Sequence, residues 1–287
     1  MSEVTEGSIP GAAGQLFMRA WRPATPRAVV AICHGFNSHS GMYGWCGQQF
    51  AQHGLATWAL DLRGRGRSEG ERFYVESFED YADDLRRLIH HATASEPGLP
   101  VFLLGHSAGG ITSCLYALEH QARLAGLICE DFAFEVPAPD LALSVLKGIS
   151  HLTPHAHALA LRNEDFSRDP QIVSAMNEDP LIAHEKQPFA TMAALVRADE
   201  RLRRSFAQIT LPVLIIHGSA DKAARPSGSQ HFHEQVGSTD RTLKLYQGRY
   251  HDPLNDLGRE TVLADIVDWV AGRLPGRQHD HGHPGQA

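Results

Sequence analysis

The stretch that decides the fold is Leu99–Thr112, which reads LPVFLLGHSAGGIT. Its first half is a short apolar run typical of a buried strand, and its second half is compatible with a helix. Between them lies Gly105–Gly109, a G-x-S-x-G motif with Ser107 at its centre. A serine on a sharp strand-to-helix turn is crowded, and glycines two positions before and after it leave room. The motif alone also fits an ordinary glycine-rich turn, but its strand and helix context predicts a nucleophile elbow.

Strand-like apolar runs and helix-compatible segments alternate on both sides of this stretch. Such alternation predicts an α/β fold with a mostly parallel central sheet and helices on both faces. The expected strands are Gly14–Trp21, Arg27–Cys33, Leu55–Leu60, Leu99–Leu104, Leu124–Cys129, Leu211–His217 and Arg241–Tyr246. The expected helices are Trp45–His53, Ser77–His91, Ile111–His120, Ser227–Val236 and Arg259–Gly272.

The alternation breaks between Pro137 and Ser205, where the sequence shows helix-like pieces and no clear strand. We expect this segment to be a helical insert that lies over the carboxyl edge of the sheet as a cap. The helix-like pieces are Leu141–Ile149, His155–Leu161 and Phe189–Arg197. The predicted division is a core of residues 1–136 and 206–274, with residues 1–10 frayed, a cap of residues 137–205, and a disordered His-rich tail of residues 275–287.

Bulk composition excludes several classes of partner. The 287 residues carry a net charge of −7 and no basic block, which argues against nucleic acid as a partner. No run of about 18 apolar residues predicts a membrane span, and the acidic N-terminus does not resemble a secretory signal. The four cysteines (Cys33, Cys46, Cys114 and Cys129) form no C-x-x-C pair, so we expect reduced thiols and a cytoplasmic protein.

Polar residues that follow the predicted strands supply the partners that a serine nucleophile needs. A serine hydroxyl requires an adjacent base, and histidine has a suitable unperturbed pKa of about 6.5. A carboxylate must then orient the imidazole and stabilise its cation. Asp221 follows Ser107 by 114 residues, and His251 follows Asp221 by 30. We therefore predict Ser107 as nucleophile, Asp221 as acid and His251 as base.

Two of these roles have rival residues. Asp131 also ends a predicted strand and could orient the histidine, although Asp221 stands in a short turn just before the strand that leads to His251. His217 is the rival base, but it still belongs to its strand, whereas His251 lies in a loop. Asp221 could alternatively serve only as a cap for the helix that begins near residue 227.

The developing oxyanion of an acyl-transfer reaction needs backbone N–H donors. Ala108 stands at a helix start, where its N–H has no partner within the helix. We expect the second donor to be Phe36, in the loop after His34-Gly35.

Three arginines and the histidines raise the question of an anion site or a metal site. Arg63, Arg65 and Arg67 lie in a glycine-rich loop that does not match a phosphate-binding motif. We expect Arg63 to form a structural ion pair behind the site and Arg65 and Arg67 to be solvated. Metal-ligand spacings such as H-E-x-x-H do not occur, so neither a metal nor a cofactor is implied.

The sequence resembles the α/β-hydrolase superfamily, and within it the monoacylglycerol lipase and lysophospholipase-like serine hydrolases. The resemblance rests on HGFNSHSGMY (34–43), DLRGRGRSEG (61–70), LLGHSAGG (103–110), LRNEDFSRDPQIVSAMNEDPLI (161–182), LIIHGSADKAARPSG (214–228) and LKLYQGRYHDPLND (243–256). It implies the same triad, Phe36 and Ala108 as oxyanion donors, and a cap that forms the acyl-chain pocket.

The chain departs from the resemblance at the alcohol end of the pocket. Ser38 and Met42 stand where the glycerol lipases carry Glu and Arg, and Ala108 replaces their usual Met. These differences leave monoacylglycerol open as the substrate but leave ester hydrolysis intact. The pair Glu130-Asp131 is also more acidic than the resemblance predicts.

We expect a carboxylic-ester hydrolase that acts on a small-molecule ester or lipid-like substrate through an acyl-enzyme. A thioesterase, an amidase or an acyltransferase could use the same triad, because fold does not choose among them. A non-catalytic binding protein is the remaining alternative. Apolar cap residues could contact a membrane surface transiently or pack on the core, and packing is favoured; they are Leu141, Val145, Leu146 and Ile149.

Overall fold

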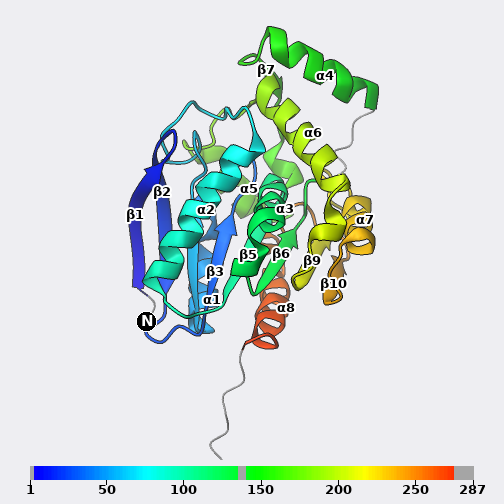
Figure 1. Cartoon of the computed structure of the whole chain (residues 1–287). Coiled ribbons are helices and arrows are strands. Elements are labelled where there is room, and N and C mark those ends of the chain that lie inside the picture. The colour runs from blue at the N-terminus through cyan, green and yellow to red at the C-terminus, as the bar shows by residue number, and fades with distance from the viewer. Residues whose placement is uncertain (1–2, 135–139, 275–287) are drawn as a thin grey trace, which may run out of the picture.

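The structure, a computed structural model, describes residues 3–134 and 140–274. Its main sheet has eight strands in the order β1-β2-β4-β3-β5-β6-β9-β10 (Figure 1). They are β1 (Glu3–Gly11), β2 (Gly14–Arg22), β3 (Ala28–Cys33), β4 (Leu55–Leu60), β5 (Val101–His106), β6 (Gly126–Glu130), β9 (Val213–Gly218) and β10 (Arg241–Tyr246). Six of these strands (β4, β3, β5, β6, β9 and β10) pair with their neighbours in parallel, whereas β2 pairs antiparallel with both β1 and β4. The predicted α/β class with a mostly parallel sheet is confirmed.

Helices cover both faces of this sheet. Consecutive residues of the central strands point to opposite faces, so each face has its own hydrophobic core. Val29 and Ala31 of β3 belong to one core with α2 and α3, while Val30 and Ile32 belong to a second core with α1 and α8. The helices are α1 (Gly44–Gln52), α2 (Phe78–Ser95), α3 (Ala108–His120), α4 (Asp140–Leu152), α5 (Pro170–Glu178), α6 (Phe189–Arg203), α7 (Pro226–Gln235) and α8 (Arg259–Ala271).

The N-terminus differs from the prediction. Residues 1–10 were expected to be frayed, but β1 pairs with β2 along its whole length as the edge hairpin of the sheet. Its side chains are mostly exposed or half-buried, and only Ile9 is buried. The strand therefore carries no apolar run that sequence periodicity could detect. Backbone pairing to β2 determines its conformation.

The segment of residues 140–205 contains strand as well as helix. Residues His155–Leu161 were expected to be helical, but β7 (His157–Leu159) pairs antiparallel with β8 (Gln187–Pro188). The expectation of no strand in this segment is therefore wrong. Figure 1 shows α4 and β7 stacked against α6, beyond one end of the main sheet. The division into core and cap remains a prediction.

The surface of α4 bears on the predicted membrane contact. Leu146 is half-buried and packs against the main core, whereas Leu152 is 84% exposed. The side chains of Leu141 and Val145 lie outside the described residues, as does the predicted tail of residues 275–287. Within residues 3–134 and 140–274, helices long and apolar enough to cross a membrane do not occur.

Candidate active site

The turn at Ser107 has the strained geometry that its sequence predicts. Ser107 joins β5 to α3 with φ 55° and ψ −122°, a left-handed φ that is uncommon outside glycine. A Cβ on Gly105 would lie 2.4 Å from Ser113 Oγ, and a Cβ on Gly109 would lie 2.1 Å from the Cys33 carbonyl oxygen. Both positions therefore require glycine. Ser107 itself is 5% exposed.

Three side chains far apart in sequence form a continuous hydrogen-bonded chain. Ser107 Oγ lies 2.7 Å from His251 Nε2, and His251 Nδ1 lies 2.7 Å from Asp221 Oδ2. The side chains of His251 and Asp221 are 1% and 0% exposed. This is the geometry of a nucleophile, a base and an orienting acid.

Asp221 is held as a carboxylate by several donors. Its Oδ1 accepts hydrogen bonds from the backbone N–H groups of Ala223 (2.7 Å) and Ala224 (3.0 Å), in the turn after β9. Burial works against the charge, but His251 and His217 outweigh it and hold the pKa of Asp221 well below its usual range. Asp221 is therefore ionised at neutral pH and can stabilise an imidazolium.

The rival acid, Asp131, lies close to Asp221 and His251 but differs from Asp221 in its protonation state. It is fully buried, and its Oδ1 accepts a hydrogen bond from Gly218 N–H at 2.9 Å. Burial, followed by the charges of Asp221 and Glu130, raises the pKa of Asp131 well above its usual value. A neutral Asp131 cannot offset the charge of His251. The structure thus favours Asp221 as the partner of His251.

The rival base, His217, reaches the same acid from the other side. Its Nε2 lies 3.0 Å from Asp221 Oδ2 and 3.5 Å from Asp131 Oδ1, and its Nδ1 lies 2.7 Å from Ser229 Oγ. It is fully buried within β9. Since His251 is the histidine that contacts Ser107, His217 is placed to act on Asp221 rather than on a substrate.

The loop after β3 lies directly against the elbow. A Cβ on Gly35 would be 2.8 Å from Ser107 Cβ and 3.4 Å from Ala108 N, so the backbones approach closely there. His34 fixes the loop: its Nδ1 donates to the Gly35 carbonyl (2.7 Å) and its Nε2 accepts from Leu62 N–H (3.0 Å). Burial lowers the pKa of His34 to about 4, so the ring is neutral. Phe36 follows Gly35 and Ala108 follows Ser107, so both residues adjoin this close approach, which the predicted oxyanion hole would require.

The arginine loop only partly matches its prediction. Arg63 forms the expected buried ion pair, with its Nη2 2.7 Å from Asp84 Oδ1, and Arg67 pairs with Glu6 at the surface. Arg65 was expected to be solvated, but it is 1% exposed and pairs with Glu185. That prediction failed because the partner lies 120 residues away in sequence.

Several residues that support His251 were not predicted. The Phe166 ring packs edge-on against His251 with centroids 5.0 Å apart, and His106 Nε2 lies 2.8 Å from the His251 carbonyl oxygen. Glu130 accepts a hydrogen bond from Leu254 N–H at 2.9 Å, in the same loop. The acidity of the Glu130-Asp131 pair was the one available sequence signal for this support.

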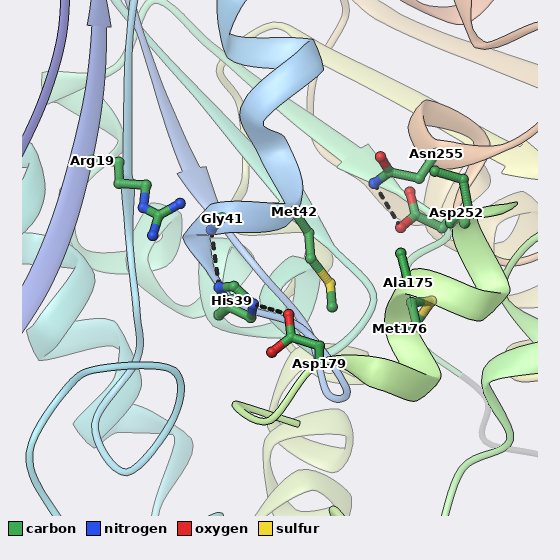
Figure 2. Close-up of a pocket in the computed structure, with 10 residues that line it drawn as sticks. Arg19, His39, Gly41, Met42, Ala175, Met176, Asp179, Asp252 and Asn255 are labelled. Carbon is green, nitrogen blue, oxygen red and sulfur yellow. Dashed lines mark hydrogen bonds and ion pairs between the residues drawn. The ribbon is translucent and has the colours of Figure 1, made fainter. Parts of the chain in front are cut away.

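A cavity of about 290 Å³ lies next to this loop. Figure 2 shows Arg19, His39 and Asp179 on one side, Asp252 and Asn255 on the other, and Met42 between them. Asp252 directly follows His251 and is 7% exposed. Its Oδ2 accepts a hydrogen bond from Asn255 Nδ2 (3.0 Å), and its Oδ1 has no hydrogen-bond partner among the described residues. The cavity therefore combines charged and polar side chains with the apolar wall formed by Met42 and Met176.

The chain is similar to several known proteins over most of its length. The family model described as serine aminopeptidase, S33, matches residues 24–258. A monoacylglycerol lipase of Mycolicibacterium smegmatis is 33% identical over 94% of this chain and 98% of its own length. A monoglyceride lipase of Rattus norvegicus is 34% identical over 90% of this chain and 88% of its own length. The crystal structure of a Paleococcus ferrophilus monoacylglycerol lipase matches with a TM-score of 0.81 and 27% identity, over 90% of this chain and 99% of that one.

Proposed function

Because the chain belongs to the serine aminopeptidase S33 family and is an ester-hydrolysing serine hydrolase of the α/β-hydrolase fold, we propose that it cleaves acyl esters through an acyl-enzyme on Ser107. The observation that carries this proposal is the chain of two 2.7 Å contacts from Ser107 Oγ through His251 to Asp221. The strained backbone at Ser107 adds support, because such strain persists where the surroundings enforce it for function.

The proposed reaction has two steps. In the first, Ser107 Oγ attacks the ester carbonyl carbon while its proton passes to His251 Nε2. The tetrahedral oxyanion accepts hydrogen bonds from the N–H groups of Phe36 and Ala108. It collapses when the alcohol leaves with the proton from His251, and the acyl group stays on Ser107. In the second step, water attacks the acyl-enzyme with His251 again as base, which releases the carboxylic acid and restores Ser107.

Residues 140–205 act in this proposal as the cap that forms the acyl-chain pocket. The alcohol part of the substrate is assigned to the cavity of Figure 2. Two features support this placement: the cavity is lined by Asp252, which follows His251, and by Met42, which stands where the resemblance implies a head-group contact. A monoacylglycerol or lysolipid head group would contact the charged and polar side chains that line this cavity.

A fluorophosphonate probe and a panel of acyl esters test the proposal. We expect the probe to label Ser107, and we expect Ser107→Ala to abolish both labelling and turnover. Ser238→Ala is the matched control, since Ser238 is a buried serine in the loop before β10. Full turnover by the Ser107→Ala variant would contradict the nucleophile assignment.

Peptide hydrolysis is a second candidate, because the description of the matching family model names an aminopeptidase. The same triad can attack an amide. Aminoacyl arylamides tested beside the matched aryl esters distinguish the two functions. We expect kcat/KM for the esters to be higher, and a preference for the arylamides would favour the peptidase.

A further inference from the structure

A buried ion pair connects the loop after β4 to the segment between α5 and α6. Arg65 and Glu185 are 1% and 5% exposed, and their side chains are in direct contact through Arg65 Nη1 and Glu185 Oε1. Arg65 also donates from Nη2 to Gln187 Oε1 (2.8 Å) and from Nε to Tyr81 Oη (3.0 Å). Burial opposes its charge, but Tyr81 and Glu185 raise the pKa of Arg65 above its usual value. The Arg65 guanidinium is therefore charged, and both side chains are enclosed.

Both members of this pair contact the loop that carries Phe36. Glu185 Oε1 accepts a hydrogen bond from Asn37 N–H at 3.0 Å. The Arg65 guanidinium carbon lies 4.5 Å from the centroid of the Phe36 ring. One residue thus holds the backbone just after Phe36, and the other packs on the Phe36 side chain.

The backbone at Asn37 needs such support. Its φ is 49°, a left-handed value that residues other than glycine adopt only occasionally. The Asn37 side chain makes further contacts in the segment of residues 140–205, since its Nδ2 donates to Asn163 Oδ1 (2.9 Å) and to the Leu161 carbonyl (3.3 Å). The conformation of this loop therefore depends on residues of the predicted cap.

We propose that Glu185 is a positioning residue for the oxyanion hole and that Arg65 neutralises its buried charge. Glu185 fixes the Asn37 N–H and with it the neighbouring peptide that presents the Phe36 N–H to the oxyanion. The oxyanion hole is then complete only when the predicted cap is seated on the core. This inference rests on the proposed roles of Ser107 and Phe36.

A second buried ion pair in the same loop provides a matched control. Arg63 donates from Nε to Asp84 Oδ2 (2.8 Å) and from Nη2 to Asp84 Oδ1 (2.7 Å). Asp84 lies on α2, so this pair joins the loop to the core. It joins the same kinds of charged group and is also largely buried, but its recorded hydrogen bonds and ion pairs within the described residues do not involve Phe36 or Asn37. A purely structural role would make the two pairs equivalent.

The experiment compares two double variants of the full-length protein. Arg65→Met with Glu185→Gln, and Arg65→Met with Glu185→Met, both remove the two buried charges together, so neither leaves an unpaired charge. They differ at residue 185. The Gln side chain can still accept a hydrogen bond from Asn37 N–H, whereas the Met side chain cannot. We expect the Gln version to keep kcat within about 5-fold of the wild type and the Met version to lower kcat about 10- to 100-fold, because one oxyanion donor is worth about 10²–10³-fold in kcat. KM should change less than about 3-fold in both.

Inhibitor binding separates positioning from general damage. An alkylboronic acid forms a tetrahedral adduct with Ser107, so its Ki should rise in parallel with the loss of kcat. The Ki of a non-hydrolysable ether analogue of the ester should not change. In the control, Arg63→Met with Asp84→Asn should leave kcat and both Ki values unchanged even if the protein unfolds at a lower temperature. Glu185→Asp, which keeps the charge but shortens the side chain, serves if the Glu185→Met version does not fold, and we expect it to lower kcat about 10-fold.

The outcomes test the positioning role and the proposed function separately. Equal kcat in the Gln and Met versions, or unchanged kcat in Glu185→Asp, overturns the positioning role while the wild type remains active. An equal loss of kcat in the Arg63–Asp84 control also overturns it. A wild type without Ser107-dependent turnover overturns the proposed function, and the positioning role with it.

Discussion

His217 Nε2 lies 3.0 Å from Asp221 Oδ2, the same oxygen that lies 2.7 Å from His251 Nδ1. One carboxylate oxygen therefore serves two histidines, of which only His251 contacts Ser107. The second histidine withdraws part of the negative charge that Asp221 would otherwise offer to His251. This relationship makes His217 a modulator of the proposed base.

The role of His217 is testable by a pH profile. In His217→Gln, Asp221 loses the imidazole that lies 3.0 Å from its Oδ2, and we expect it to stabilise the protonated form of His251 more strongly. We expect the acidic limb of the kcat/KM profile to move to higher pH by about half a unit to one unit. Rates measured between pH 5 and 9 on one aryl ester give the shift. A shift to lower pH would show that His217 supports the base in another way.

Substitution by asparagine should lower kcat strongly at Asp221 and hardly at all at Asp131. We expect Asp221→Asn to lower kcat by about 10³–10⁴-fold, because the ionised partner of His251 is lost. Asp131→Asn should change kcat less than about 5-fold, since the raised pKa of Asp131 already makes it neutral and isosteric with the amide. Stopped-flow or steady-state ester hydrolysis measures both. A large loss in Asp131→Asn alone would make Asp131 the orienting acid.

Glu130 should make stability depend on pH. Burial, followed by the charge of Asp252, raises the pKa of Glu130 well above its usual value. The folded state thus keeps a proton that the unfolded state releases above about pH 4.3. The contribution of Glu130 to stability is complete below that pH and is lost as the pH rises toward the folded pKa.

Glu130→Gln isolates this effect. We expect the free energy of unfolding of the variant to rise relative to the wild type as the pH increases from 5 to 8, by up to about 1.4 kcal/mol per pH unit. Urea denaturation of both proteins at each pH provides the comparison. A difference that is constant with pH would mean that Glu130 has the same charge in both states.

Met42 offers a test of the alcohol site. An arginine there would place donors inside the cavity, where the glycerol head group is proposed to bind. We expect Met42→Arg to raise kcat/KM for a monoacylglycerol relative to the ethyl ester of the same acid by about 5-fold, the scale of one added hydrogen bond. Gln52→Arg adds the same charge at the exposed end of α1, outside the cavity, and should leave the ratio unchanged. Equal changes in both variants would remove the cavity from the proposal.

Local pattern was sufficient for the elbow and for the mostly parallel α/β class of the sheet. The apolar run before Ser107, the two glycines around it and the alternation of strands and helices all depend on sterics and hydrophobic burial within short stretches of chain. The carboxyl ends of parallel strands meet at one edge, so Ser107, Asp221 and His251 could be expected together. Their contacts agree with that expectation.

The tertiary structure alone decided the protonation states and the long-range partners. Asp131 and Asp221 have the same side chain and both follow strands, but burial beside other acids raises the pKa of one while two histidines lower that of the other. From the sequence alone, Arg65 in its glycine-rich loop is predicted to be a solvated charge. The folded chain brings Glu185 and Phe36 into contact with it. Sequence by itself determined which residues stand at strand ends, because that follows from local periodicity. Desolvation and charge pairing act through space, so only the fold could assign their effects.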